Sequence, residues 1–472
     1  MRRFIIVLAS LLLVLALLLA PAYLRYRWRA GIVPPWVRLA GMEINGGDRS
    51  EIEAALARFF TEPAALYYDD RRLILRPQAV GFQVDLTAML AEAQAYNTPD
   101  RLLRYLVEQT LNRQPTFADV PLRYTVDHNA VDAWLAEAAA TCDQAPLPPQ
   151  PVLATLTIAP GRPGRQLDIP ASRERVVAAL IDPRVRSAAL VVRETPPPPL
   201  TIAALRDLLQ ARLDLFPGIA SLFLHHIPTG DEIAINADVA YAGMSTLKIA
   251  IVTELYRHLD EPPDVETSKL ISETMALSGN FTANLLLGII GDGDPNAGVR
   301  VLNESLRTLG LKNTFMAAPY DRKLAGLPRI VTEANSRTDY DTQPDPYMQT
   351  TPREIGLVLQ MLVECSQGGG TLLAAYGDQY TPAECQQALD YMALNELKEL
   401  LPGGIPPGTR FVHKHGYVAD THGDVAAIWG PAGPYILSVF LYRPTWLEWE
   451  LSNSTMREVS QAVWNYFALV SR

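Results

Sequence analysis

The chain has 472 residues, of which 49% are hydrophobic and 19% are charged. This length predicts two or three domains, and the composition predicts packed cores and excludes a largely disordered chain. The formal net charge is -10 and the basic residues are mostly scattered arginines, so no nucleic-acid-binding surface is expected. With 7 histidines and 3 cysteines spread along the chain, neither a metal framework nor another cofactor is predicted.

Residues 1–30 are predicted to be a membrane anchor or a signal peptide. Arg2-Arg3 precede an apolar stretch that runs to Leu24, which is long enough to cross a bilayer. Ala20-Pro21-Ala22 is similar to a small-residue cleavage site, but its proline favours an uncleaved anchor; a buried core helix is the remaining alternative. We expect a single-pass protein of the cell membrane with its bulk outside the cytoplasm, or alternatively a secreted protein.

An oxidising compartment would also affect the cysteines. Cys365 and Cys385 lie close in sequence and could form a disulfide there, which would leave Cys142 unpaired. Two free, buried thiols are the alternative, and the sequence leaves both open.

The region 35–193 contains an internal repeat. Residues 75–86 and 158–169 share the pattern apolar-x-Pro-x-x-x-Gly-x-x-x-Asp-apolar, each followed by a helical stretch. Glycine and proline at fixed offsets predict that one backbone turn is built twice. The region is therefore predicted to be a duplicated small α+β unit, with strands and helices in the segments 50–60, 65–68, 73–75 and 131–140.

Most of residues 38–190 resembles the peptidoglycan-binding domain found beside VanW-like and other cell-wall proteins of bacteria. The resemblance rests on the repeated Pro, Gly and Asp pattern. It implies peptidoglycan as a partner of residues 35–193. The alternative is a spacer that holds the rest of the chain away from the membrane.

Pro196-Pro197-Pro198-Pro199 marks a stiff linker over residues 194–200. The next domain, residues 201–472, opens with an amphipathic helix and a predicted β-hairpin at 219–235. Largely helical sequence follows to about residue 405, and the chain closes with further strands and a helix, at 410–417, 425–429, 435–442 and 454–469. Strands at both ends with helices between them predict a sheet with an inserted helical subdomain.

Three short motifs carry the candidate chemistry. The chain has six lysines, and two of them fall in the motifs Ser245-Thr-Leu-Lys248 and Lys414-His-Gly416; Ser278-Gly-Asn280 lies between the two. Serine and lysine three apart at a helix start share one face, where a desolvated lysine can take the serine proton. The helix N-terminus also supports negative charge at the serine.

The second and third motifs add proton relay and substrate binding. Ser278 can pass a proton to a leaving nitrogen, and Asn280 can hold Lys248 and a substrate amide; an ordinary helix N-cap at Ser278 is the alternative. Lys414 and Gly416 share one face of a strand, so Lys414 is predicted to meet a substrate carboxylate and Gly416 to admit the acyl group. His413, His415 and His422 suggest a metal only weakly, since no further ligands accompany them.

With these motifs in order, residues 201–472 resemble the class A β-lactamase catalytic domain, supported also by Ser278 to Leu287 and by Asp424 to Trp429. The resemblance implies an α/β multi-domain chain whose β-lactamase/transpeptidase-like α-β sandwich follows the duplicated domain and one N-terminal transmembrane helix. It implies the following site: Ser245 as nucleophile, Lys248 as base, Ser278 as proton shuttle, Asn280 and Lys414 as substrate-orienting groups, and the amides of Ser245 and Tyr417 as the oxyanion hole, next to His415 and Gly416.

The sequence departs from that family at three places. Gly279 replaces an aspartate, and His415 replaces a threonine. The family's deacylating glutamate motif is missing before Thr350-Thr351-Pro352, where Glu333 is the nearest but poorly matching candidate. Without a carboxylate to activate water an acyl-enzyme persists, so acylation is better supported than rapid turnover.

The sequence thus predicts an envelope serine hydrolase that acts on β-lactams or D-Ala-D-Ala-type peptides. A D-Ala-D-Ala carboxypeptidase or penicillin-binding protein with slow deacylation is one alternative. A non-catalytic peptidoglycan-binding envelope protein is the other. Rapid covalent labelling of Ser245 separates this last class from the enzymes.

Overall fold

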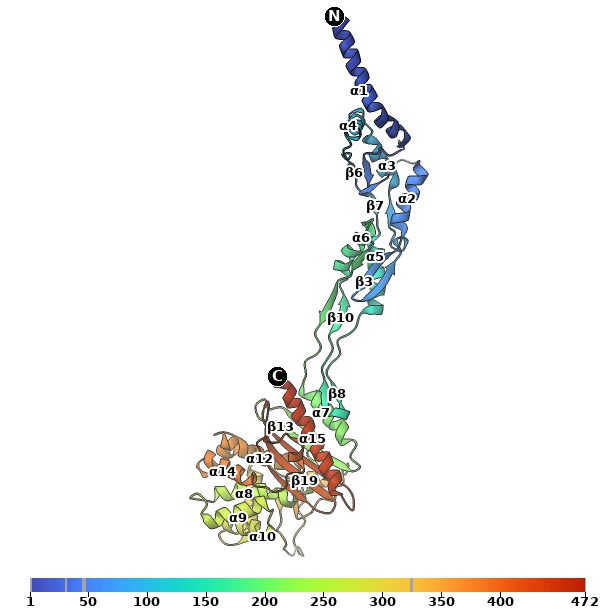
Figure 1. Ribbon diagram of the computed structural model, residues 1–472. Helices are drawn as coiled ribbons and strands as arrows, with labels where there is room; N and C mark the ends of the chain where they lie inside the picture. Colours follow the sequence, from blue (N-terminus) through green and yellow to red (C-terminus); the bar gives the residue numbers. More distant parts are fainter. Residues whose placement is uncertain (1, 30–31, 45–47, 323–325, 472) are drawn as a thin grey trace. The chain divides into compact units, whose positions relative to one another are not determined.

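The computed structural model describes residues 2–29, 32–44, 48–322 and 326–471 (Figure 1). The first helix, α1 (Arg2–Arg29), is long and apolar enough to cross a membrane. A signal sequence has the same properties. Residue contacts divide the chain into two compact units: Met1–Leu147 with Arg162–Pro197, which includes α1, and Pro148–Gly161 with Pro198–Arg472.

The first unit is built from short strands and capped helices. Its described strands form four small sheets, in the orders β2-β1-β6, β11-β3-β4, β5-β7 and β10-β12. The strands are β1 (Val37–Leu39), β2 (Met42–Glu43), β3 (Ala64–Tyr68), β4 (Arg71–Leu75), β5 (Gln83–Val84), β6 (Ala118–Val120), β7 (Tyr124–Thr125), β10 (Gly164–Leu167), β11 (Ser187–Ala189) and β12 (Val192–Thr195). The helices are α2 (Arg49–Thr61), α3 (Leu86–Ala95), α4 (Pro99–Thr110), α5 (His128–Cys142) and α6 (Ile169–Ile181).

The two halves of the repeat share their helix starts but not their turns. Asp85 caps α3 by accepting from Ala88 N, and Asp168 caps α6 in the same way from Ala171 N. Gly81 ends a short 3-10 helix at φ +63°, whereas Gly164 begins a strand without a positive φ. The prediction of one turn built twice is therefore wrong. Gly164 is needed for space instead, because a Cβ there would lie 2.6 Å from Pro146 Cδ.

The hairpin β8 (Gln150–Val152) and β9 (Thr157–Ala159) belongs to the second unit, although the sequence pattern placed it inside the region 35–193. Its apolar side chains Leu156 and Ile158 join the core of the second unit. The carbonyl of Leu156 also accepts a hydrogen bond from Asn465 Nδ2 at 2.9 Å. The hairpin belongs to the unit in which its apolar side chains are buried. A local repeat pattern in the sequence does not determine which unit that is.

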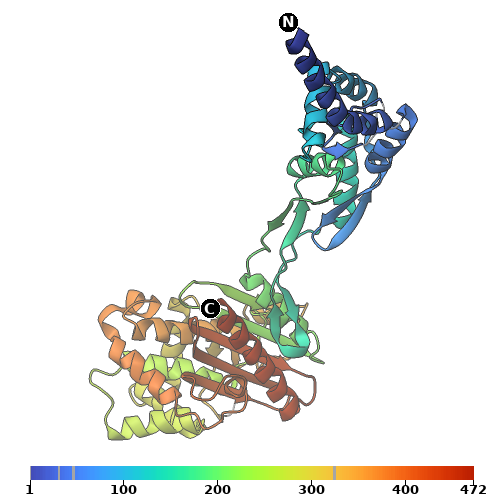
Figure 2. The same ribbon diagram turned by 45° about the horizontal axis from the view of Figure 1, so that its top comes forward.

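The second unit contains an antiparallel five-stranded sheet in the order β14-β13-β20-β19-β18. Its strands are β13 (Ile219–His226), β14 (Glu232–Ile235), β18 (Phe411–Tyr417), β19 (Thr421–Gly430) and β20 (Gly433–Tyr442). Helices α7 (Ile202–Leu213) and α15 (Trp449–Val470) contact one face, as Figures 1 and 2 show for α15, and α12 (Pro352–Ser366) contacts β13, β19 and β20 on the other.

Neighbouring residues of β20 enter different cores, as a pleated strand between two layers requires. Ile436 and Phe440 belong to the core on the α12 side, whereas Leu437 and Leu441 belong to the core on the α15 side. Both cores are apolar, so the sheet is buried on both faces. The predicted sheet with an inserted helical subdomain is confirmed.

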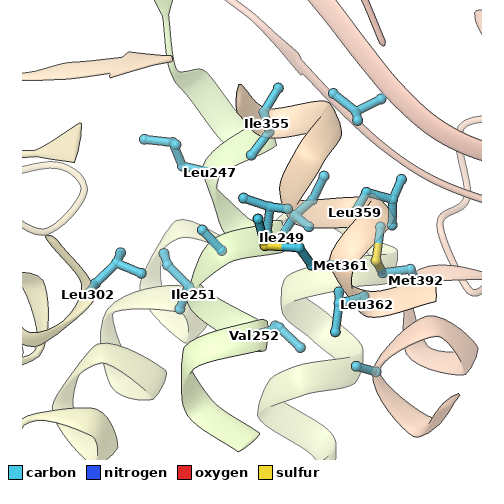
Figure 3. Close-up of a cluster of buried hydrophobic side chains, with 14 of the residues drawn as sticks. Leu247, Ile249, Ile251, Val252, Leu302, Ile355, Leu359, Met361, Leu362 and Met392 are labelled. Carbon is cyan, nitrogen blue, oxygen red and sulfur yellow. The ribbon is translucent and has the colours of Figure 1, made fainter. Parts of the chain in front are cut away.

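The helical subdomain surrounds α8 (Lys248–Arg257), an almost wholly buried helix (Figure 3). Ile249, Ile251 and Val252 of α8 pack with Leu302 and Leu359 from neighbouring helices. The other elements of this region are α9 (Val265–Ala276), α10 (Asn280–Ile290), α11 (Pro295–Thr308), α13 (Thr371–Tyr376), α14 (Pro382–Met392) and the small sheet of β15 (Tyr241–Ala242), β17 (Met348–Thr350) and β16 (Phe315–Met316). This packing gives the start of α8 a fixed place beside the sheet.

A disulfide joins Cys365 of α12 to Cys385 of α14, so the paired state is the one that the structure adopts. Cys142 is buried and free. The Cα atoms of the pair are 5.9 Å apart, within the usual range for a disulfide.

Candidate active site

Ser245 and Lys248 meet at the start of α8. Ser245 lies in the 3-10 turn Met244–Leu247, and Lys248 Nζ donates to Ser245 Oγ at 2.7 Å. The preceding residue, Met244, has φ +49°, a conformation that costs a non-glycine residue free energy. The tight turn therefore aims the serine hydroxyl at the lysine amine of the next turn.

Lys248 is buried and held by acceptors from the second motif. Its Nζ also donates to the carbonyl of Ser278 and to Asn280 Oδ1, both at 2.8 Å. Burial lowers the pKa of Lys248 to about 8, against an opposing effect of Asp321. Roughly a tenth of Lys248 is then neutral at pH 7, and this neutral form can accept the Ser245 proton.

Lys414 lies on the other side of Ser278. Its Nζ donates to Ser278 Oγ at 2.8 Å and to the carbonyl of His415 at 3.0 Å. Burial, and then the neighbouring Lys248, lower the pKa of Lys414 to about 7. The hydroxyl of Ser278, a residue at φ +61°, thus lies between two buried amines, since Lys248 Nζ is 3.4 Å away.

The edge strand β18 comes close to the turn Met244–Leu247, which contains Ser245. A Cβ on Gly416 would lie 2.8 Å from both Met244 Cβ and Ser245 N, so this position requires glycine. Ladder hydrogen bonds from Val418 N to Thr421 O and from Trp429 N to Arg410 O place the even-numbered residues of β18 in hydrogen-bonded pairs. The Tyr417 N–H therefore points away from β19, to the open edge of the sheet.

A cavity of about 340 Å³ opens over these groups, and its walls include Ser245, Asn280, Tyr417 and Asp345. Its position lets one carbonyl group approach Ser245 Oγ. The amides of Ser245 and Tyr417 lie at the two sides of the narrow gap that Gly416 permits. This arrangement has the components of an oxyanion hole.

Each histidine near the third motif has a different partner. His413 Nδ1 and Asp424 Oδ1 lie 2.8 Å apart and fully buried, and His422 Nδ1 is 2.7 Å from Ser452 Oγ. His415 Nδ1 is 3.4 Å from Asn395 Nδ2, and burial lowers its pKa to about 3. His415 is therefore neutral at physiological pH.

Two site residues were missed in the sequence because no motif marks them. Tyr320 places its ring 4.6 Å from Lys248 Nζ and donates from its hydroxyl to the Met244 carbonyl at 2.9 Å. Asp321 accepts from Asn280 Nδ2 at 3.1 Å and lines the cavity of Ser245. Both residues follow β16 in a loop, and their only sequence signal is a Pro-Tyr-Asp run after a short apolar strand.

Glu333 is not brought to these groups. Its side chain is exposed, it precedes the short 3-10 turn Ala334–Ser336, and it is absent from the described wall of the Ser245 cavity. In the part of the chain that the structure describes, no carboxylate forms a hydrogen bond with Ser245. The candidate for water activation that the sequence suggested is therefore separate from the cavity.

Two known protein families match separate parts of the chain. Residues 257–467 match the family described as "Beta-lactamase enzyme family", and residues 75–185 match the one described as "Putative peptidoglycan binding domain". The first match contains Ser278, Asn280 and Lys414 but begins after Lys248. No curated protein sequence matches the chain.

Among solved structures, the chain is similar to PBP-A, at 18% identity and a TM-score of 0.44 over 58% of this chain and 99% of that one. It is also similar to an ancestral class A β-lactamase, reconstructed for the last common ancestor of Gram-negative bacteria. That similarity has 23% identity and a TM-score of 0.41 over 55% of this chain and 98% of the other.

Proposed function

Because its C-terminal domain belongs to the β-lactamase enzyme family, we propose that this chain is a serine hydrolase that forms an acyl-enzyme at Ser245 with β-lactams or related cell-wall peptides. The observation that carries the proposal is the 2.7 Å contact between Ser245 Oγ and Lys248 Nζ, combined with the lowered pKa of Lys248. A serine hydroxyl needs such a proton acceptor to become a nucleophile.

Acylation follows from the contacts of the four polar groups. Neutral Lys248 takes the Ser245 proton while Ser245 Oγ attacks the substrate carbonyl carbon. The carbonyl oxygen accepts hydrogen bonds from the backbone N–H groups of Ser245 and Tyr417. As the C–N bond breaks, the Ser278 hydroxyl gives its proton to the nitrogen, and protonated Lys248 returns a proton to Ser278 along their contact. Lys414 donates to Ser278 Oγ and stabilises negative charge on it.

We expect deacylation to be slow. Two carboxylates are among the described walls of the cavity, and both are engaged: Asp321 accepts from Asn280 Nδ2, and Asp345 accepts from the Tyr347 backbone N–H. The exposed Glu333 lies outside the cavity wall. Hydrolysis of the acyl-enzyme requires a base beside the incoming water. This supports a penicillin-binding type of acyl-enzyme, with the D-Ala-D-Ala carboxypeptidase as the related alternative, over a fast β-lactamase.

The test is to follow intact mass after mixing the full chain, in detergent, with benzylpenicillin. We expect an adduct on the wild-type chain that persists for hours, and none on the Ser245→Ala variant. Clearance within seconds would contradict slow deacylation but keep the acyl-enzyme. The absence of an adduct, both here and with a D-Ala-D-Ala peptide thioester, would refute the enzymatic proposal and leave the non-catalytic wall protein.

We further propose that α1 anchors the chain in the cell membrane, with residues 35–193 outside the cytoplasm and in contact with peptidoglycan. The apolar length of α1 and the family match of residues 75–185 support this assignment. Co-sedimentation of the Ser245→Ala chain with insoluble peptidoglycan tests it without covalent capture. Equal sedimentation with and without peptidoglycan would favour the spacer instead.

A further inference from the structure

A second cavity, of about 630 Å³, adjoins the one that contains Ser245. Tyr417 and Val418 line both cavities, so the two meet at the end of β18. The rest of the described lining consists of four ring side chains and three aliphatic ones, namely His415, His422, Trp446, Trp449, Leu397, Ala419 and Leu447. We call it the aromatic cavity.

The aromatic rings are organised around Trp449. Tyr417 meets it nearly at right angles with ring centroids 5.8 Å apart, and His422 lies 5.4 Å away. Trp449 Nε1 donates to Glu399 Oε2 at 2.8 Å, which fixes the plane of the indole. Trp446, by contrast, is 60% exposed and leaves an apolar ring available to a ligand. Such a wall favours an aromatic or aliphatic group.

The aromatic cavity carries no formal charge. Among its described lining residues there is no aspartate, glutamate, lysine or arginine. Its two histidines are neutral at physiological pH, because burial lowers the pKa of His415 to about 3 and that of His422 to about 4. Lys414 is fully buried, and its Nζ donates to Ser278 Oγ and to the His415 carbonyl. None of the described lining residues therefore presents a cation to a carboxylate.

In the proposed mechanism, the leaving group lies on the side of Ser278 and Lys414 that adjoins this cavity. In the mechanism above, the Ser278 hydroxyl protonates the leaving atom, and Lys414 Nζ links that hydroxyl to the His415 carbonyl over contacts of 2.8 and 3.0 Å. The ring of His415 lines the aromatic cavity. The atoms attached to the leaving nitrogen or sulfur therefore emerge beside it.

From these contacts we infer that the aromatic cavity is a leaving-group subsite for an uncharged, apolar or aromatic moiety. This inference rests on the proposed function and narrows its substrate class. The preferred substrate releases a neutral apolar fragment, such as an internal peptide or an ester segment. A leaving group that ends in a free carboxylate, such as a terminal D-alanine, is disfavoured because it would lose hydration without gaining a cation.

The test uses two N-acetylglycyl thioesters that differ only in the leaving thiol, 2-phenylethanethiol or 3-mercaptopropionate. Ser245 Oγ displaces the thiol, so the C–O bond forms, the C–S bond breaks and the sulfur takes the relayed proton. Thiol release in the first turnover is followed with the full chain in detergent. We expect kcat/KM, corrected for hydroxide-catalysed hydrolysis, to favour the phenylethyl thioester by about tenfold or more.

The variant Trp446→Ala assigns that preference to the cavity. It should lower kcat/KM for the phenylethyl thioester by roughly tenfold and leave the carboxyethyl thioester within about twofold, and Trp446→Phe should restore most of the loss. Equal rates for the two thioesters, or equal losses for both in Trp446→Ala, would overturn the subsite while the penicillin adduct at Ser245 remained. The absence of both thiol release and adduct would overturn the proposed function with it.

Discussion

Replacing Gly416 with alanine is the sharpest test of the geometry around Ser245. The new Cβ would lie 2.8 Å from Met244 Cβ and from Ser245 N, and 3.1 Å from Thr246 N. Non-bonded heavy atoms are attracted rather than repelled at separations of about 3.5 Å or more. The strand β18 and the turn Met244–Leu247 must therefore move apart by about 0.7 Å. Backbone atoms on both sides line the contact, and no flexible side chain can absorb the shift.

That displacement moves the Tyr417 amide away from the oxyanion. Loss of one oxyanion-hole donor, or a misplacement close to 1 Å, lowers rates by about 100-fold, equivalent to about 2.7 kcal/mol. We therefore expect the second-order rate constant for acylation of Gly416→Ala by a fluorescent penicillin to fall about 100-fold. The thermal unfolding midpoint should change little, because β18 is an edge strand.

The matched control is Gly369→Ala, since a Cβ at Gly369 has no atom within 4 Å and its φ is not positive. It should acylate at the wild-type rate. If Gly416→Ala acylates within about threefold of the wild type, the Tyr417 amide does not act on the oxyanion, and this part of the proposed mechanism is incorrect.

Three further predictions follow from buried groups. Since burial lowers the pKa of Lys248 to about 8 and only its neutral form accepts a proton, the acylation rate should rise with pH and level off above about 8; a flat profile between pH 6 and 9 would contradict Lys248 as base. Asp424→Ala removes the buried hydrogen-bond partner of His413 and should lower the free energy of unfolding, measured with urea, by about 1.5–3 kcal/mol; a loss below about 0.5 kcal/mol would argue against this contact. Joint replacement of Cys365 and Cys385 by alanine removes a disulfide between residues 20 apart and should lower the free energy of unfolding by about 3 kcal/mol. No such loss should occur if the two thiols are reduced in the native protein.

Local sequence patterns predicted much of the second unit. Alternation and turn signals located β13 and β14, and the strands β18, β19 and β20 lie within a few residues of their predicted positions. The positions of these strands can be read from the local sequence because a strand between two layers carries apolar side chains on both faces. The family resemblances rested on short motifs of the same kind.

The three motifs were also visible in the sequence, since lysine is rare and two of six lysines fall in them. Side-chain chemistry at fixed spacing predicted that Ser245 and Lys248 share a helix face, and the structure places their polar atoms 2.7 Å apart. Their assignment to catalysis stays a prediction until Ser245 is tested.

Contacts between distant segments were decided only by the tertiary structure. The prediction that Lys414 meets a substrate carboxylate is untested, and its contact with Ser278, 136 residues away in the chain, was not predicted. Asp321 accepts a hydrogen bond from Asn280, 41 residues away, and the Leu156 carbonyl accepts one from Asn465 of α15. Spacing along the chain fixes which face of a helix or strand a side chain occupies. The spacing does not determine which distant element packs against that face. The packing partner depends on how the apolar faces of whole helices and sheets are buried against one another.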